Sequence, residues 1–293
     1  MKIGFIGLGI MGKPMSRNLL NAGFDLIVYD IDRAAVEIIE KAGAKGAASS
    51  EEVARNADVI ITMLPRADIG KSVLEEILTG IRENSIVIDM SSVSPVVSKE
   101  FARMVEAKNC KFLDAPVSGG EIGAIKATLA FMIGGDEAVV EKVRPVFKAL
   151  GKSIMVVGGN GSGSVAKLAN QIMVNLNIAA VAEALVLATK AGADPKKVFE
   201  AVRGGFAGSA VLEEKAPMMY SRNFKAGGPI YINLKDITNV MHTADNLSVS
   251  LPLTAILKEI MNSLKATGHL NDDHSSIVNY YENTNNVIVK TKS

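Results

Sequence analysis

Three glycines near the start of the chain constrain its fold most strongly. Gly7-x-Gly9-x-x-Gly12 stands directly after a short apolar run, Lys2–Ile6, and opens an amphipathic segment. In a turn between a strand and a helix, the first glycine permits a tight bend, the second lets a phosphate approach the backbone, and the third permits close helix packing. The triplet alone is a weak signal. In this context it predicts a dinucleotide-binding turn made of Gly7, Leu8, Gly9, Ile10, Met11 and Gly12.

Short apolar runs alternate with amphipathic segments through the first half of the chain. The runs that we expect to form strands are Lys2–Ile6, Leu26–Tyr29, Val59–Met63, Ile86–Asp89 and Phe112–Asp114. This alternation predicts βαβ crossovers and a parallel sheet. Two later runs, Leu129–Ile133 and Ile154–Val157, flank a helical pattern and should extend the sheet. The predicted fold class is α/β, a doubly wound sheet of Rossmann type, followed by an all-α domain.

The second half of the chain shows no convincing strand pattern. A glycine-rich break at residues 158–163 is followed by a long helical pattern over residues 164–191, which is almost uncharged between Lys167 and Glu183. A helix this apolar is expected to be buried between domains or in a subunit interface. Later helices are predicted to begin near Asp194, Ser209, Asn233, Pro252 and Asp272. The expected domains are residues 1–161, which bind the dinucleotide, and residues 162–293, a helical domain for substrate and oligomerisation.

Composition narrows the possible partners. The chain has 32 Lys+Arg and 31 Asp+Glu with no dense run of either sign, which argues against nucleic acid or an anionic membrane as a partner. The single cysteine, Cys110, and the absence of Cys/His clusters with metal-site spacing favour a reducing compartment and no metal. The beginning lacks a signal-peptide pattern, and no apolar run was expected to span a membrane. We expect a cytoplasmic protein whose last residues, Asn283–Ser293, form a frayed tail.

Asp30 ends the second predicted strand at the separation expected for a carboxylate that binds the ribose hydroxyls of a dinucleotide. A carboxylate there repels a 2′-phosphate and favours NAD(H), whereas the nearby Arg33 keeps NADP(H) open. The alternative for Asp30 is a plain turn carboxylate. Leu64 and Pro65 follow another strand, at the sheet edge where such cofactors bind, although a simple turn would also explain them.

Two further groups of residues suit a carboxylate-bearing substrate. Ser118-Gly119-Gly120 follows a strand, and a loop of this kind can bind an anion through backbone N–H groups. Lys167 is the odd residue at the start of the apolar helix, with Asn170 and Gln171 one turn further along the same face. These three could hold a substrate and transfer a proton; alternatively, the loop is only a turn and the lysine only reaches solvent.

Taken together, these motifs resemble the β-hydroxyacid dehydrogenase family, which includes 3-hydroxyisobutyrate dehydrogenases and tartronate semialdehyde reductases. The resemblance covers almost the whole chain. The residues that carry it are Gly4–Met15, Asp114–Gly120, Gly161-x-Gly163-x-x-x-Lys167 and Leu234-Lys235-Asp236. Within the family, the second half is most like the tartronate semialdehyde reductases, at Arg203–Ser209, Lys215–Met219, Arg222–Lys225, Asp273–Ser275 and Tyr280–Glu282.

The resemblance implies specific roles. Lys167 would be the general acid/base, Ser118, Gly119 and Gly120 would hold the substrate carboxylate, and Lys235 would reach toward the nicotinamide. Ser94 would lie near the nicotinamide ribose, and Asp236 would be structural. Many family members have an asparagine four residues after the lysine, where this chain has Gln171, so that either Asn170 or Gln171 could support Lys167.

The expected activity is the NADH-dependent reduction of tartronate semialdehyde to glycerate, or the reverse oxidation of a short 3-hydroxy acid, by a homo-oligomer such as a dimer or tetramer. Two alternatives share the same catalytic residues: 3-hydroxyisobutyrate dehydrogenase and 2-(hydroxymethyl)glutarate dehydrogenase. An alternative of another class is a dinucleotide-binding module without catalysis, against which the presence of Lys167 and the Ser118 loop argues.

Overall fold

A computed structural model describes residues 1–291 of the chain. Contacts divide the molecule into two compact units, Met1–Lys167 and Leu168–Ser293. The division falls inside one long helix, α8 (Ser162–Lys190). The domain boundary after residue 161 therefore stays a prediction, and the units are described one at a time.

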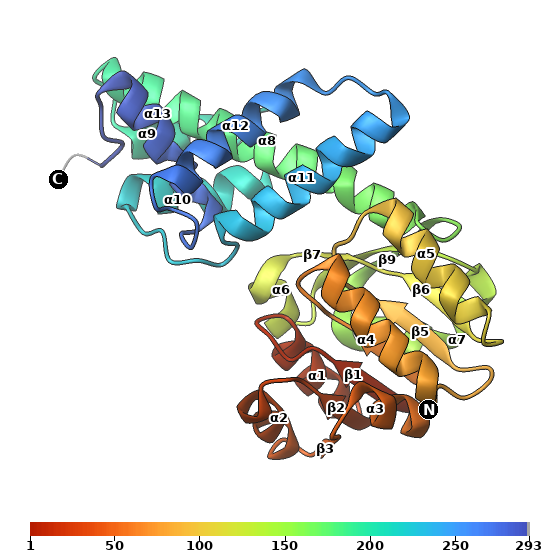
Figure 1. The fold of residues 1–293 in the computed structure, drawn as a ribbon. Helices are drawn as coiled ribbons and strands as arrows, with labels where there is room; N and C mark the ends of the chain where they lie inside the picture. Colours follow the sequence, from red (N-terminus) through yellow and green to blue (C-terminus); the bar gives the residue numbers. More distant parts are fainter. Residues whose placement is uncertain (292–293) are drawn as a thin grey trace. The chain divides into compact units, whose positions relative to one another are not determined.

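The first unit is built on a nine-stranded sheet in the order β3-β2-β1-β4-β5-β6-β8-β7, with β9 paired to β8 (Figure 1). The first six strands of that order are parallel, β8 runs antiparallel to β6 and β7, and β9 is parallel to β8. The strands are β1 (Lys2–Ile6), β2 (Asp25–Tyr29), β3 (Lys45–Gly46), β4 (Val59–Thr62), β5 (Ile86–Asp89), β6 (Lys111–Asp114), β7 (Val117–Ser118), β8 (Leu129–Gly134) and β9 (Gly151–Gly158).

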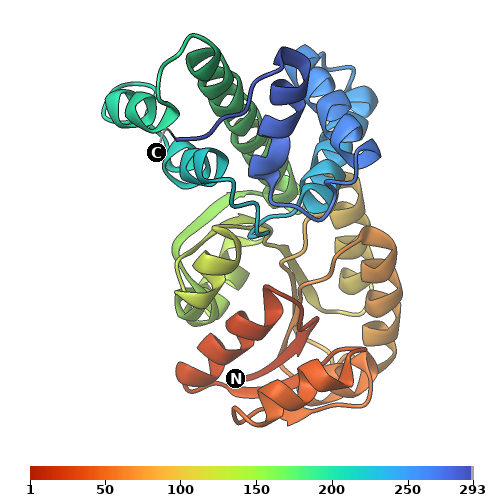
Figure 2. The same ribbon diagram turned by 90° about the vertical axis from the view of Figure 1, so that its left-hand side faces the viewer.

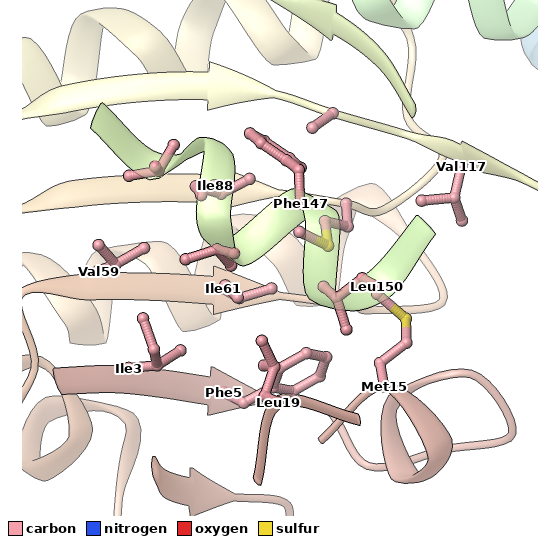
Figure 3. Packing of buried hydrophobic residues seen from close by; sticks show 14 of the residues in the cluster. Ile3, Phe5, Met15, Leu19, Val59, Ile61, Ile88, Val117, Phe147 and Leu150 are labelled. Carbon is pink, nitrogen blue, oxygen red and sulfur yellow. The ribbon is translucent and has the colours of Figure 1, made fainter. Parts of the chain in front are cut away.

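Helices cover both faces of this sheet (Figure 2). They are α1 (Gly12–Asn21), α2 (Arg33–Glu40), α3 (Ser50–Asn56), α4 (Ala67–Gly80), α5 (Pro95–Glu106), α6 (Gly120–Ile125) and α7 (Glu137–Leu150). Because successive residues of a strand point to opposite faces, Val59 and Ile61 pack on one side with Phe147 of α7 (Figure 3). Ile60 packs on the other side with Phe101 of α5. Both faces are apolar, as a doubly wound sheet requires.

The predicted α/β class is confirmed, and every strand predicted from an apolar run is present. Two strands were not predicted, β3 and β7, which are two residues long each. β9 is longer than predicted because it begins at Gly151 and includes the exposed Lys152 and Ser153. A strand of two residues, or a strand end made of polar residues, shows no pattern of apolar residues from which it could be predicted.

In the second unit, as far as residue 291, the regular elements are helices, which confirms the predicted all-α part. After α8 come α9 (Pro195–Val202), α10 (Ala210–Ser221), α11 (Ile230–Leu247), α12 (Pro252–Ala266), the 3-10 helix η1 (His274–Ile277) and α13 (Val278–Asn285). Their shared core includes Ile178, Leu185, Met219, Ile237 and Val289, each at most 2% exposed.

The predicted frayed tail is wrong for the part of it that is described. α13 runs to Asn285, and beyond it Val289 is fully buried. The N–H of Val289 donates to Glu282 Oε1 at 2.7 Å. The short apolar stretch near the chain end therefore packs into the second unit, and residues 292 and 293 lie outside the described part.

The expectation that no segment could span a membrane also needs correction. α8 is long and apolar enough to cross a membrane. Its mean hydropathy is 1.8 over an 18-residue window, and 39% of that window is buried within the protein. Core helices of soluble proteins pass the same test, so this is weak evidence for a membrane span. Gln171, a buried polar residue along it, bonds Asp236 of α11, which fits a core helix.

Candidate active site

The glycine turn joins β1 to α1, and its three glycines have distinct reasons to be there. Gly7 has φ of +99°, and a Cβ on it would collide with the carbonyl oxygen of Met63. A Cβ on Gly12 would collide with the carbonyl oxygen of Gly7, so α1 can begin close against the turn. Over residues 1–291, by contrast, no heavy atom lies within 4 Å of a Cβ built on Gly9.

The turn therefore leaves open space beside Gly9 at the N-terminus of α1. Among the described side chains none caps this helix at Met11. Since the N–H of Lys13 donates to the carbonyl oxygen of Gly9 and Pro14 has no N–H, a pyrophosphate would meet the glycine turn itself and the positive end of the helix dipole. Leu8 is buried in the core, whereas the side chain of Ile10 is 52% exposed over the turn. These residues fit a dinucleotide.

Asp30 follows β2 and is bonded to the glycine turn. Its Oδ2 accepts the N–H of Leu8 at 2.6 Å and its Oδ1 accepts the N–H of Asp32 at 2.8 Å. Each carboxylate oxygen has a second lone pair, so both can also accept from ribose hydroxyls. Asp30 thus holds the turn in shape before any cofactor arrives.

A hollow of about 590 Å³ lies beside Asp30, between the ends of β2 and β3. It is lined by Tyr29, Asp30, Ile31, Arg33, Gly46, Ala47, Ala48 and Glu52. Ile31 is 93% exposed there and offers an apolar surface to an adenine ring. The guanidinium of Arg33 bonds Glu40 Oε2 at 3.1 Å. Residues 46–48, which form one wall of this hollow, could not be predicted from the sequence, because the two-residue strand β3 that positions them shows no strand pattern.

The carboxyl ends of β4 and β5 form the next part of the same sheet edge. Asp89, 4% exposed, accepts from Thr62 Oγ1 at 2.8 Å and from the N–H of Ser91 at 3.0 Å. Ser91 Oγ in turn accepts the N–H of Leu64 at 2.9 Å, which fixes the loop that continues into the exposed Pro65. Ser94, half-buried, is the N-cap residue of α5.

The Ser118 loop and Lys167 lie together in the first unit. Gly119 and Gly120 have φ of +128° and +58° and are exposed, which leaves their backbone accessible. Lys167 is half-buried on α8, and its Nζ donates to the carbonyl oxygen of Val117 at 2.8 Å. Val117 immediately precedes Ser118. The amino group of Lys167 therefore lies at the entrance of a loop suited to an anion.

Asp114, at the end of β6, holds the start of the helix that carries Lys167. It is 1% exposed, and its two carboxylate oxygens accept the N–H of Gly161 at 2.7 Å and of Ser164 at 2.8 Å. Burial raises the pKa of this carboxyl to about 6, although the two N–H donors act in the opposite direction. The sequence analysis assigned Asp114 to a motif but gave it no role.

The remaining predicted site residues belong to the second unit. Gln171, 6% exposed, donates from Nε2 to Asp236 Oδ2 at 2.7 Å, and Asn170 donates to Gln171 Oε1 at 2.9 Å. Lys235 on α11 pairs with Asp236 Oδ1 at 3.2 Å and lines a hollow of about 400 Å³. Asp236 thus orders both Gln171 and Lys235, in keeping with the structural role expected for it.

A largely parallel sheet in this strand order, with this glycine turn and a carboxylate at the end of β2, defines a dinucleotide-binding domain of Rossmann type. Comparison with family models specifies it further. The model described as the NAD binding domain of 6-phosphogluconate dehydrogenase matches residues 2–159. The model described as NAD-binding of NADP-dependent 3-hydroxyisobutyrate dehydrogenase matches residues 161–281. The chain belongs to the β-hydroxyacid dehydrogenase family, to which the 3-hydroxyisobutyrate dehydrogenases also belong, and it is an NAD(P)-dependent enzyme.

Individual relatives match over nearly their whole length. The chain is 45% identical to 2-hydroxy-3-oxopropionate reductase of Escherichia coli K12, over 96% of this chain and 97% of the relative. It is 36% identical to 2-(hydroxymethyl)glutarate dehydrogenase of Eubacterium barkeri, over 99% and 97%. Among solved structures, Mycobacterium tuberculosis 3-hydroxyisobutyrate dehydrogenase with L-serine superposes with a TM-score of 0.89 at 31% identity, covering 96% of this chain and 98% of that one.

Proposed function

We propose that this enzyme reduces 2-hydroxy-3-oxopropionate, also called tartronate semialdehyde, to glycerate with NADH, and that Lys167 supplies the proton. The observation that carries the proposal is the bond from Lys167 Nζ to the carbonyl oxygen of Val117, the residue before Ser118. It puts an ammonium group next to a loop suited to the carboxylate of a short semialdehyde.

In this proposal the substrate carboxylate accepts hydrogen bonds from the Ser118 hydroxyl and from the exposed N–H groups of Gly119 and Gly120. That contact fixes one end of a three-carbon substrate and aims its aldehyde at Lys167. A bound nicotinamide supplies the hydride that reduces the aldehyde carbon. Lys167 stabilises the negative charge on the aldehyde oxygen and donates the proton that completes the alcohol. The reverse reaction oxidises a 3-hydroxy acid, with Lys167 as the base.

The proposed preference for NAD(H) rests on Asp30. Its carboxylate stands at the edge of the hollow beside β2, where it would accept the ribose hydroxyls of NAD and repel the 2′-phosphate of NADP. Arg33 lines the same hollow but is paired with Glu40, which reduces its attraction for a phosphate. NADPH is therefore expected to work less well than NADH.

Other roles are part of the same proposal. Asn170 and Gln171 bind the substrate or support Lys167. Ser94, Leu64 and Pro65 line the cofactor site, and Lys235 reaches toward the nicotinamide. We also propose that the enzyme is cytoplasmic and works as a homo-oligomer.

The choice of substrate is supported by the 45% identical relative from Escherichia coli, named 2-hydroxy-3-oxopropionate reductase. Steady-state kinetics with a panel of substrates and both cofactors test it. We expect the highest kcat/KM for tartronate semialdehyde with NADH. A higher value for 3-hydroxyisobutyrate or for 2-(hydroxymethyl)glutarate, the substrate named by the 36% identical relative, would contradict the proposal and leave the family intact.

A further inference from the structure

We propose that Asp114 is a positioning residue for Lys167, and that the segment Asp114–Ser118 aligns the proton donor with the substrate loop as one unit. This inference rests on the proposed function, because it assumes that Lys167 is the proton donor. It assigns to Asp114 a part in turnover beyond the stability of the fold.

The first support is the double contact of the Asp114 carboxylate with α8. One oxygen accepts the N–H of Gly161 and the other that of Ser164, so the carboxylate spans the first turn of the helix. Ser164 lies three residues before Lys167, on the adjoining turn. A change in how Asp114 holds this turn therefore changes where the lysine side chain begins.

Two glycines show how closely the helix approaches this carboxylate. A Cβ on Gly163 would lie 2.5 Å from the carbonyl oxygen of Asp114 and 2.9 Å from its Oδ2, and a Cβ on Gly134 would lie 2.5 Å from its Oδ1. All three distances are shorter than a side-chain carbon tolerates, so the contact requires glycine at both places.

The second support is that the same segment holds Lys167 directly. Three residues after Asp114, the carbonyl oxygen of Val117 accepts from Lys167 Nζ at 2.8 Å. One residue later the Ser118 loop begins. The segment thus holds α8 at its start through a side chain and at Lys167 through the backbone, and it leads straight into the residues proposed to bind the substrate carboxylate.

The third support is that Asp114 differs from the ordinary helix caps of this chain. Asp32, Asp136 and Asp194 each cap a helix that begins at the next residue. Asp114 reaches α8 from 47 and 50 residues away in sequence, from the end of a central strand, and its burial disfavours the charged form, with a pKa of about 6. A helix that needed only a cap could take one from its own flank.

The test compares Asp114→Asn with Asp136→Asn. Asparagine keeps one acceptor oxygen but presents an N–H₂ group where the second oxygen was, so one of the two N–H donors of α8 loses its partner. Asp136 is the matched control, since it caps α7 through the N–H of Ala138 at 2.8 Å and has no part in the proposed site. Active-site concentration is set by NADH titration, which confines the comparison to folded enzyme.

We expect Asp114→Asn to lower kcat about 10-fold or more, in line with the ~10²-fold loss that a misplacement of about 1 Å can cause. The solvent deuterium isotope effect on kcat should rise, because proton transfer becomes slower, while the Kd for NADH stays within about 2-fold. Asp136→Asn should lower thermal stability and leave kcat and the isotope effect unchanged. Unchanged kcat and isotope effect in Asp114→Asn would overturn the inference.

A second variant covers the case in which Asp114→Asn does not fold. Asp114→Ser adds no atoms to this closely packed place, and its shorter side chain cannot reach the N–H groups of both Gly161 and Ser164. It should lower kcat with the same rise in isotope effect. Full activity in folded Asp114→Ser would count against the inference.

Failure of the proposed function would look different. Amide hydrogen exchange of the α8 start does not depend on any substrate, and it should quicken in Asp114→Asn but not in Asp136→Asn. Faster exchange together with a fully active Lys167→Ala enzyme would contradict the function and leave the contact of Asp114 with α8 intact. Unchanged exchange would contradict the positioning role itself.

Discussion

Carboxylates at strand ends of the first unit bond backbone N–H groups of neighbouring turns. Asp30 holds the glycine turn, Asp89 the loop after β4 through Ser91, and Asp114 the start of α8. Each fixes a piece of backbone that the proposed chemistry uses. Single substitutions at these residues and at Lys167 should therefore separate binding from turnover.

Replacing Lys167 tests its assignment as proton donor. Lys167→Ala should lower kcat by ~10²-fold or more, because general acid/base catalysis typically contributes that much, with little change in the Kd for NADH. Lys167→Arg should fail as well, since a guanidinium keeps the charge but is a very poor proton donor near neutral pH. Lys190→Ala is the matched control, as Lys190 also donates from α8 to a backbone carbonyl, that of Asn285, at 3.0 Å. Near-normal turnover of folded Lys167→Ala would contradict the assignment of Lys167 as the proton donor.

Replacing Asp30 tests the cofactor preference. Asp30→Ala should reduce the ratio of kcat/KM for NADH over NADPH, because the repulsion of the 2′-phosphate disappears while Arg33 remains. It should also weaken NADH binding, since the N–H of Leu8 loses its acceptor. Steady-state kinetics with both cofactors measure the ratio, and a wild-type enzyme that prefers NADPH would contradict the assignment.

His274 should make the second unit sensitive to acid. Burial lowers its pKa to about 4 from the ordinary 6.5, with Lys215 acting in the same direction and Asp273 against it. The unfolded chain therefore takes up a proton near pH 6.5 that the folded chain refuses until about pH 4. This group alone should lower the free energy of unfolding by about 2 kcal/mol between pH 7.5 and pH 5.

Urea unfolding of wild type and His274→Phe at the two pH values measures this loss as the difference between the two proteins, because the raised pKa of Asp114 changes stability in the opposite direction over the same range. His274→Phe should remove most of it, whereas His269→Phe, at a side chain 31% exposed, should keep it. An equal loss in wild type and His274→Phe would show that His274 is not the residue responsible.

At the scale of elements, the strands and helices that could be predicted from the sequence are those with a clear pattern of buried apolar residues. Strands such as Val59–Thr62 and Ile86–Asp89 are buried throughout because helices cover both faces, and their apolar residues reveal them in the sequence. The cap of α7, Asp136, stands next to that helix in the sequence. β3 and β7 are too short to show a period. The contacts of Asp114 and of Lys167 join residues 47 to 50 positions apart, and no local signal names such partners. The candidate residues could be predicted; how they hold one another could not.

The segment after α13 gives a test at this scale. Val289 is fully buried among the helices of the second unit, while Ile288 beside it is 67% exposed. Val289→Ala should lower the free energy of unfolding by about 2 kcal/mol through lost burial and a residual cavity, and Ile288→Ala should change it by less than about 0.5 kcal/mol. Denaturant unfolding of the two variants makes the comparison. Equal, small effects would support a frayed tail and contradict the packing of Val289.

At the scale of the whole molecule, exposed apolar side chains on α8 support the proposed homo-oligomer. Met173 is 66% exposed and Leu187 is 72% exposed on this largely uncharged helix, so one chain alone leaves apolar surface of α8 uncovered. Light scattering at micromolar concentration should give a mass above that of one chain, and Leu187→Glu should lower it. The control Val96→Glu, which changes an exposed valine of α5, should leave the mass unchanged. A wild-type mass of a single chain would refute the oligomer.

Lys167 is the last residue of the first compact unit, while its helix continues to Lys190. A chain cut at that boundary would keep only Ser162–Lys167 of α8, less than two turns at ~3.6 residues each, and so short a helix unwinds in water. The fragment would retain the dinucleotide turn but carry Lys167, the proposed proton donor, on an unfolded chain end. Chimeras that exchange second units between relatives should therefore join the two sequences before Ser162, so that α8 is inherited whole from one parent.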